Sequence, residues 1–141
     1  MKNLIYAGTN TSNSVVAGAV VPISTIEKKF NRCNACSSID LTGNVVTIRT
    51  NSRRPRYNGW AKITFTGATT GNAVLGVYLN GTQIPFAVGS ETIGTATTEV
   101  HNVVIPFSIL TNCCSTNTIS IVNTGTIGLT VTNASILVVE D

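Results

Sequence analysis

The four cysteines are the residues of this chain whose type and spacing most clearly suggest chemistry. Cys33 and Cys36 form a C-x-x-C pair, and Cys113 and Cys114 are adjacent in the sequence. A zinc ribbon uses two C-x-x-C pairs, each of which holds the metal through a flexible turn. Adjacent side chains on a strand point to opposite faces, so the second pair does not match that pattern. A zinc site made of all four cysteines, packed thiols, and disulfides that form after cell lysis are three open interpretations, and we favour packed thiols that serve as scaffolding.

The histidine and the acidic residues do not suggest an active site. His101 is the single histidine of the chain. Enzymes that bind a catalytic metal through histidine usually hold the ion with several histidines and a carboxylate. The six acidic residues are scattered, and the sequence has no phosphate-binding loop, dinucleotide-binding motif or Gly-x-Ser-x-Gly motif. We predict that the chain is not an enzyme, that it uses no cofactor, and that His101 is an interface or surface residue.

A cluster of four arginines is the strongest charge feature. It consists of Arg49, Arg53, Arg54 and Arg56. Such a cluster could contact an acidic partner protein or nucleic acid, or it could be a solvated loop. The net charge is only +3, and Tyr57 is the one aromatic residue beside the cluster, whereas single-strand binding needs aromatic rings next to the positive charge. Nucleic acid is therefore the least favoured partner, and a protein contact and a plain loop stay open.

The composition is typical of a folded chain with few charges on its surface. Apolar residues make up 43% of the 141 residues and charged residues 11%, so Thr, Asn and Ser must supply most of the polar surface. These short side chains suit turns and the solvent faces of strands. The apolar run near the start has three residues, whereas a secretory signal needs about 7 to 15 and a membrane helix about 20. We expect a chain made in the cytoplasm, with no membrane partner.

The pattern along the chain predicts one all-β domain over residues 1–141. Short runs of Val, Ile, Thr and aromatic residues are separated by Gly and Asn, and this rhythm favours an antiparallel sandwich or barrel. One stretch, 24–30, looks like one or two helical turns, and Asn80-Gly81 is the strongest hairpin signal. The predicted strands are 3–7, 14–21, 38–41, 45–50, 58–66, 73–80, 83–88, 97–107, 117–123 and 129–139.

Two of these strands are apolar on both faces, although a sandwich strand has only one core to face. They are 100–107 and 129–139; in the second, Leu137 falls on one face with Leu129 and Val131, and Ile136 falls on the other. A second apolar face needs a second cover, because large exposed apolar patches are uncommon on monomers. We expect a subunit interface, with a covering loop or N-terminal arm as the alternative. The candidate interface residues are Leu4, Tyr6, Val104, Ile136 and Val138.

The order of these elements resembles the TNF/C1q-like jelly roll, and more narrowly the small jelly-roll proteins of phages of gut bacteria. The resemblance covers most of the chain and rests on turns and core positions, with no catalytic signature among them. Its carrying segments are AGAVVPI (17–23), FNRC (30–33), LTGNVVTI (41–48), GWAKI (59–63), GVYLNGTQIP (76–85), VVIP (103–106), the Cys113-Cys114 pair, ISIVNTGT (119–126) and VTNASILVVE (131–140).

The resemblance implies a function that the residues alone do not. Similar phage proteins decorate capsids or form head-fibre subunits, and they are homotrimers whose inner sheet, containing the first and last strands, faces the threefold axis. We therefore expect an antiparallel jelly-roll sandwich of about 8–10 strands, on the capsid exterior of a virion, docked on the capsid protein lattice. The alternative is a receptor- or glycan-binding module of a phage tail or cell surface.

Overall fold

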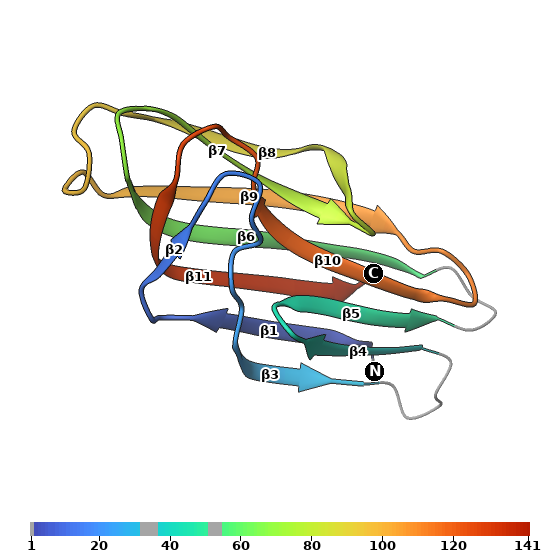
Figure 1. Cartoon of the computed structure of the whole chain (residues 1–141). Helices are drawn as coiled ribbons and strands as arrows, with labels where there is room; N and C mark the ends of the chain where they lie inside the picture. The colour runs from blue at the N-terminus through green and yellow to red at the C-terminus, as the bar shows by residue number, and fades with distance from the viewer. Residues whose placement is uncertain (1, 32–36, 51–54) are drawn as a thin grey trace.

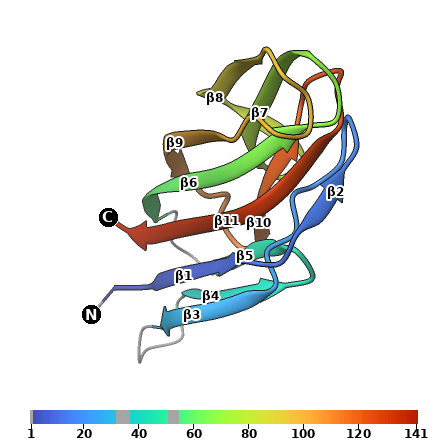
Figure 2. The same ribbon diagram turned by 90° about the vertical axis from the view of Figure 1, so that its left-hand side faces the viewer.

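The computed structural model describes residues 2–31, 37–50 and 55–141, which form two antiparallel sheets packed face to face (Figures 1 and 2). The first sheet has the order β3 (Thr25–Phe30), β1 (Leu4–Thr9), β11 (Leu129–Glu140), β6 (Arg56–Gly67) and β9 (His101–Leu110), with β2 (Asn13–Val15) also paired to β11. The second sheet has the order β4 (Ser37–Thr42), β5 (Val45–Thr50), β10 (Thr116–Asn123), β7 (Gly71–Leu79) and β8 (Thr82–Ile93). The predicted all-β jelly-roll sandwich is confirmed.

The core lies between the two sheets and follows the period-2 alternation of the sequence. Ala61, Ile63 and Phe65 of β6 are fully buried, and they face Leu75 and Val77 of β7, which are also fully buried. Alternation places these side chains inward because successive residues of a strand point to opposite faces. The strands predicted at 58–66 and 73–80 therefore each bury one face in the core.

The helical turn predicted at 24–30 is wrong, because these residues form strand β3. This strand lies at the edge of the first sheet, where Leu4 pairs with Phe30 and Gly8 with Thr25. All six of its residues are exposed, so no buried face imposes a strand-like alternation on the sequence. The sheet edge offers unpaired backbone groups, and pairing with them outweighs the weak local preference for a helix.

A β-bulge in β11 changes the faces that the sequence predicted for 129–139. The pairing of β11 with β6 shifts register between Val131 and Asn133. A bulge inserts one extra residue and so reverses the alternation beyond it. Leu129 and Val131 therefore share the inner face with Ile136, which is 1% exposed, and Leu137 lies on the outer face. The prediction that Leu129 and Leu137 share a face was wrong.

The two ends of the chain meet at one end of the sandwich (Figure 1). The buried Asn3 accepts a backbone hydrogen bond from Glu140 (2.9 Å), and its side chain donates to Ser37 Oγ (2.7 Å) and to the hydroxyl of Tyr57 (3.0 Å). The same end carries the loop between β9 and β10, because Arg56 at the start of β6 pairs with Leu110 at the end of β9. This end, called the terminal end below, is fixed by a satisfied polar network.

Candidate interaction surface

One row of outward side chains crosses four neighbouring strands of the first sheet. Tyr6 pairs with Leu137, Leu137 with Trp60, and Trp60 with Pro106, so the four side chains share a face in direct register. The rings of Tyr6 and Trp60 meet edge to face, with their centroids 5.9 Å apart. Aromatic pairs of this geometry contribute more than their buried area alone. The sheet thus carries an ordered aromatic cluster on its outer face.

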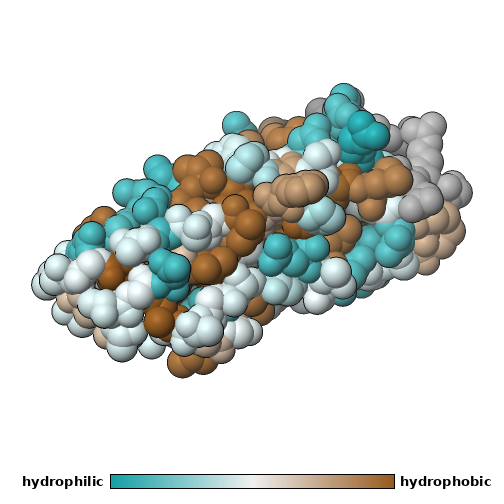
Figure 3. Space-filling view, turned by 90° about the horizontal axis from the view of Figure 1, so that it is seen from above, coloured by the Kyte–Doolittle hydropathy of each residue, from teal (hydrophilic) through white to brown (hydrophobic). Residues whose placement is uncertain are grey.

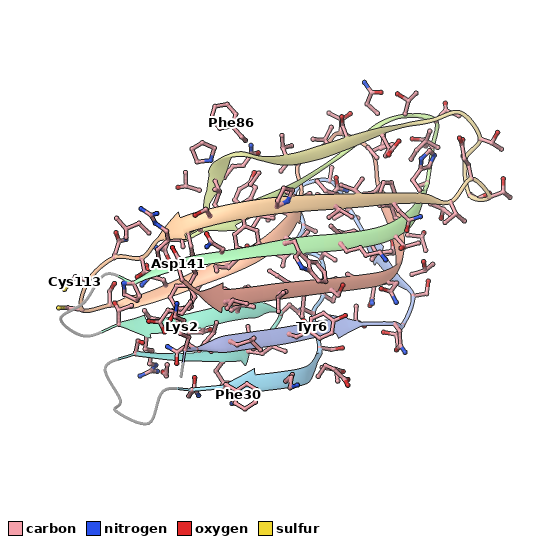
Figure 4. The ribbon with its side chains drawn as sticks, turned by 180° about the vertical axis from the view of Figure 1, so that it is seen from behind. Lys2, Tyr6, Phe30, Phe86, Cys113 and Asp141 are labelled. Carbon is pink, nitrogen blue, oxygen red and sulfur yellow. The ribbon has the colours of Figure 1, made fainter. Side chains whose placement is uncertain are left out.

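A second apolar row lies next to the first. Leu4 pairs with Val139 on one side and with Phe30 on the other, and Phe30 is 43% exposed. We call Leu4, Tyr6, Trp60, Leu137 and Val139 the apolar stripe; all five are only half-buried by this chain. Figure 4 looks onto this face, with β1, β11 and β6 towards the viewer and Tyr6 and Phe30 labelled. Each side chain of the stripe keeps part of its surface exposed, so the stripe meets solvent.

The predicted interface set divides between this face and the core. Leu4 and Tyr6 belong to the apolar stripe, and Val104, 60% exposed, points outward from β9 on the same side. Ile136 and Val138 are 1% and 0% exposed and pack in the core, so including them was an error. The cause is the bulge in β11, which exchanges the two faces of that strand.

A groove of about 510 Å³ adjoins the apolar stripe on the same face. Tyr6 and Trp60 form its aromatic part. Its polar lining includes Glu27, Lys62 and Asn133. Binding pockets of roughly 300–1,000 Å³ with apolar walls and a few polar groups are typical of small-ligand sites. The groove therefore has the size and the lining to accept a small polar ligand with an apolar side.

Phe86 is a second apolar feature, and the sequence analysis missed it. In the pairing of β7 with β8, Gly76 opposes Val88 and Tyr78 opposes Gln83, so β8 bulges between them. Phe86 sits in the bulge with φ +66° and is 97% exposed; Figure 4 shows it projecting away from the sandwich. A bulky residue at positive φ is strained, and such strain often marks a functional position. The sequence hides this bulge, because Ile84, Phe86 and Val88 are apolar at every second position and so continue the alternation through it.

Phe86 belongs to an apolar patch along the edge where β8 and β9 meet. We call Pro85, Phe86, Val88 and Leu110 the edge patch; all four are exposed, and Pro85 and Leu110 line one small cavity of about 260 Å³. Figure 3 looks down on the β7–β8 side of the molecule and shows apolar side chains along its middle, flanked by hydrophilic ones. The stripe and the edge patch are therefore separate apolar surfaces on different strands of the described residues.

The arginine cluster lies partly outside the described residues. Arg53 and Arg54 fall outside them, while Arg49 lies near the end of β5 and Arg56 begins β6. Both described side chains are exposed, and both stand at the terminal end: Arg56 O accepts a hydrogen bond from Asp141 N (2.8 Å). Positive charge and the two chain ends are thus on the same end of the sandwich.

His101 does not lie where the sequence predicted. Its side chain is 14% exposed and stacks on Phe65, with the ring centroids 6.0 Å apart, so it closes the core at the end opposite to the chain ends. Nδ1 lies 3.5 Å from Glu91 Oε2, and Nε2 lies 3.3 Å from Glu99 Oε1 without the angle of a hydrogen bond. Only the fold brings these two carboxylates together, since sequence spacing gives no sign of it.

Glu99 serves the loop between β8 and β9. Its Oε2 accepts hydrogen bonds from the backbone N–H groups of Thr95 and Gly94, both 2.7 Å, and these bonds, with a smaller contribution from His101, lower the pKa of the Glu99 carboxyl below 4.5. Among the described residues, no group of three His, Cys, Asp or Glu side chains could hold a metal ion. The cluster therefore supports the loop structure.

Two cysteines can be placed. Cys113 and Cys114 are exposed in the loop between β9 and β10, with their Sγ atoms 2.6 Å apart. Cys33 and Cys36 lie outside the described residues, so the alternative of a zinc site made of all four cysteines stays a prediction. In the part of the chain that the structure describes, no helix is long and apolar enough to cross a membrane.

The architecture matches solved TNF-type structures. Murine APRIL at pH 5.0 superposes with a TM-score of 0.63, with 9% identity over 100% of both chains. Murine APRIL at pH 8.5 gives a TM-score of 0.61 with 10% identity, also over 100% of both chains. Eiger TNF from S. frugiperda gives 0.57 with 12% identity, over 99% of this chain and 93% of that one. The fold is a TNF-like jelly roll.

The comparisons of sequence found no match, whereas the comparison of structures did. No protein-family model matches the chain, and no curated protein matches it. At identities of 9–12% the structural likeness shows the fold alone. The function must therefore be argued from the surfaces of this chain.

Proposed function

We propose that the chain is a non-enzymatic structural protein that assembles as a homotrimer and decorates the capsid exterior of a bacteriophage. The observation that carries the proposal is the apolar stripe on the outer face of the first sheet. Large exposed apolar patches are rare on monomers, and rings such as those of Tyr6 and Trp60 are enriched where subunits meet. The resemblance to phage jelly rolls, which place this sheet at a threefold axis, supplies the trimer and the virion.

The edge patch supports a ring of three. In a closed ring, each interface joins two different surfaces of neighbouring subunits. The apolar stripe is one such surface, and the edge patch with Phe86 is a second one on a different side of the sandwich. We place the edge patch of one subunit against the stripe of the next, so that each subunit uses both surfaces once.

The terminal end is the proposed foot on the capsid. Arg49 and Arg56 are exposed there, beside the chain ends, so these arginines and the N-terminal residues could contact the capsid together. Three copies joined by the trimer would dock together, and multivalent contacts bind much more tightly than one.

Proteomics of purified virions tests this function. Mass spectrometry of virions of the encoding phage should detect the chain in heads, together with the major capsid protein. Its absence from virions, or its presence only in tails, would contradict capsid decoration.

A glycan-binding module is the second candidate, and the groove beside the stripe favours it. Sugars present apolar C–H faces that stack on aromatic rings and hydroxyls that bond to groups such as those of Asn133 and Glu27. Both candidates use Trp60, so they can be separated by one titration. Quenching of Trp60 fluorescence by soluble glycans would favour glycan binding, whereas an unchanged signal at millimolar glycan would favour the capsid.

A further inference from the structure

Cys113 and Cys114 point to the same side of the chain, although they are neighbours. On an extended strand their side chains would point to opposite faces. Cys114 instead has φ +59°, in the left-handed region, and its Sγ lies 2.6 Å from Sγ of Cys113. Few non-glycine residues adopt this conformation, because it is unfavourable for a side chain with a Cβ. The turn thus brings two exposed thiols into contact.

The fold holds this turn in place from both sides. The backbone N–H of Thr50 donates to Ser115 O (3.0 Å), and its hydroxyl donates to Asn112 O. The fully buried Asn117 accepts from Asn112 N (3.0 Å) through Oδ1. The residues before and after the two cysteines are therefore tied to β5 and β10, and the unfavourable left-handed conformation is set by folding.

We propose that Cys113 and Cys114 form a vicinal dithiol that closes reversibly to a disulfide ring by exchange with small-molecule disulfides such as oxidised glutathione. This site is independent of the proposed assembly. Its partner is a small-molecule disulfide that reaches the pair from solvent. Figure 4 places Cys113 at the terminal end of the sandwich, with Lys2 and Asp141.

The exchange proceeds in two balanced steps. The Cys113 thiolate, having lost its proton to solvent, attacks one sulfur of the small disulfide; an S–S bond forms to Cys113, and one glutathione thiolate leaves and takes up a proton. The Cys114 thiolate then attacks the Cys113 sulfur and releases the second glutathione in the same way. The two cysteines are oxidised by two electrons in total, and the small disulfide is reduced to two thiols.

The order of attack follows from the sulfur contact. The hydrogen bond with Cys113 raises the pKa of the Cys114 thiol above its ordinary 9.0, with smaller contributions from desolvation and from the charge on Cys113. The thiolate is the reactive form, so the raised pKa assigns Cys114 to the second step, in which it resolves the mixed disulfide.

The resulting ring would be easy to reduce. Adjacent Cα atoms are about 3.8 Å apart across a trans peptide bond, which is shorter than the usual separation of about 4.4–6.8 Å in disulfides. Strained and exposed disulfides are the labile ones. The pair is therefore suited to reversible oxidation in the oxidising medium outside a cell and to reduction inside one.

Glutathione titration of the full chain with Cys33→Ser and Cys36→Ser tests the site, since only the pair then remains. Across buffers with a rising share of oxidised glutathione, acid-quenched samples are alkylated and weighed as intact chains. We expect both alkylatable thiols to disappear together, giving a chain two hydrogens lighter with no adduct. In the same background, Cys113→Ser and Cys114→Ser should each carry a single glutathione instead. Unfolding in urea should lower the ring-closure constant about tenfold, because the left-handed conformation is no longer set by the fold.

Three outcomes would overturn the proposal. They are glutathione adducts on both cysteines, disulfide-linked dimers, and two unmodified thiols in the most oxidising buffer. Should the double variant fail to fold, a chymotryptic map of the oxidised wild-type chain decides the question. A ring confined to the peptide that holds residues 113 and 114 supports the site, and a disulfide from either residue to Cys33 or Cys36 contradicts it.

Discussion

The outer faces of the two sheets differ in chemistry, although both are built from strands of the same alternating pattern. On the first sheet, Tyr6, Leu137 and Trp60 stand side by side in register. On the second sheet, an outward row of paired residues is polar: Asp40 pairs with Thr47, and Thr47 pairs with Thr118. A solvated face needs only short polar residues. The difference is what we expect if the first sheet meets a neighbouring subunit in the proposed trimer and most of the second sheet faces water.

Val122, on the outer face of the second sheet, is largely buried by the chain itself. Val122 pairs with Gly76 of β7 and makes an isolated bridge with Val20, and it is 8% exposed. Val21 N donates to Ile121 O (2.7 Å), so the segment after β2 lies beside β10 where β5 has ended. The five residues of the apolar stripe are only half-buried by this chain, and we propose that a neighbouring subunit covers the rest of their surface.

The largest expected effect is a difference in unfolding free energy between substitutions on the inner and outer faces of β11. Ile136→Asp places a charge in the core and should cost more than about 4 kcal/mol of unfolding free energy, enough to leave much of the chain unfolded. Leu137→Asp, one residue later, should leave the unfolding free energy of the monomer within about 1 kcal/mol of wild type. Urea denaturation of both variants measures this, and equal destabilisation would mean that the bulge does not set the faces as described.

A smaller effect is expected from matched aromatic truncations on the two outer faces. Trp60→Ala should weaken each subunit interface of the trimer about 30-fold, because central aromatic residues contribute about 2 kcal/mol or more to an interface. Tyr78→Ala, on the outer face of the second sheet, should change it less than about threefold. Sedimentation equilibrium over a range of concentrations gives both values. If Tyr78→Ala weakened the trimer more than Trp60→Ala, the interface would lie on the second sheet, which would contradict the proposal.

Acidification tests the loop between β8 and β9, at the end of the sandwich opposite to the chain ends. This loop belongs to neither of the two outer faces. The pKa of Glu99 is lowered by folding, so its hydrogen bonds to Thr95 and Gly94 stabilise the folded chain above pH 4.5, and this contribution is lost as the pH falls through the lowered pKa. Unfolding free energy should fall in that window, and Glu99→Gln should flatten the dependence. Denaturation series from about pH 7 to about pH 3 test this, and identical pH profiles would assign the loss to other groups.

The smallest effect concerns the foot. Arg49→Ser with Arg56→Ser should weaken binding to purified capsids and reduce its salt dependence, because exposed charge contacts are screened by salt and are each worth about 1 kcal/mol or less. Lys28→Ser with Lys29→Ser, on the edge strand β3, is the matched control and should leave the salt dependence as it was. Unchanged binding by the arginine variant would leave the N-terminus as the foot.

The sequence predicted most strands because alternation is a local property, and it missed features that depend on register or on distant partners. The bulge at 131–133 places two consecutive polar residues between apolar ones, which is a phase change that the sequence shows. The bulge at 84–87 has no such signal, because Ile84, Phe86 and Val88 continue the apolar alternation through it. The contacts of His101 with Glu91 and Glu99 join β9 to the end of β8 and to the loop, and no spacing rule could reveal them. The turn at Cys114 likewise depends on anchoring by Thr50.

The central claim is that the outer face of the first sheet is the assembly interface. Static light scattering of the wild-type protein and two variants, each at micromolar concentration, tests it. Wild type and Thr118→Asp, which adds a charge to the second sheet, should both have about three times the chain mass of 14.8 kDa. Leu137→Asp should have the mass of one folded chain, because a buried unpaired charge at the interface costs several kcal/mol. A wild-type mass of 14.8 kDa, or dissociation by Thr118→Asp with Leu137→Asp still assembled, would contradict the account.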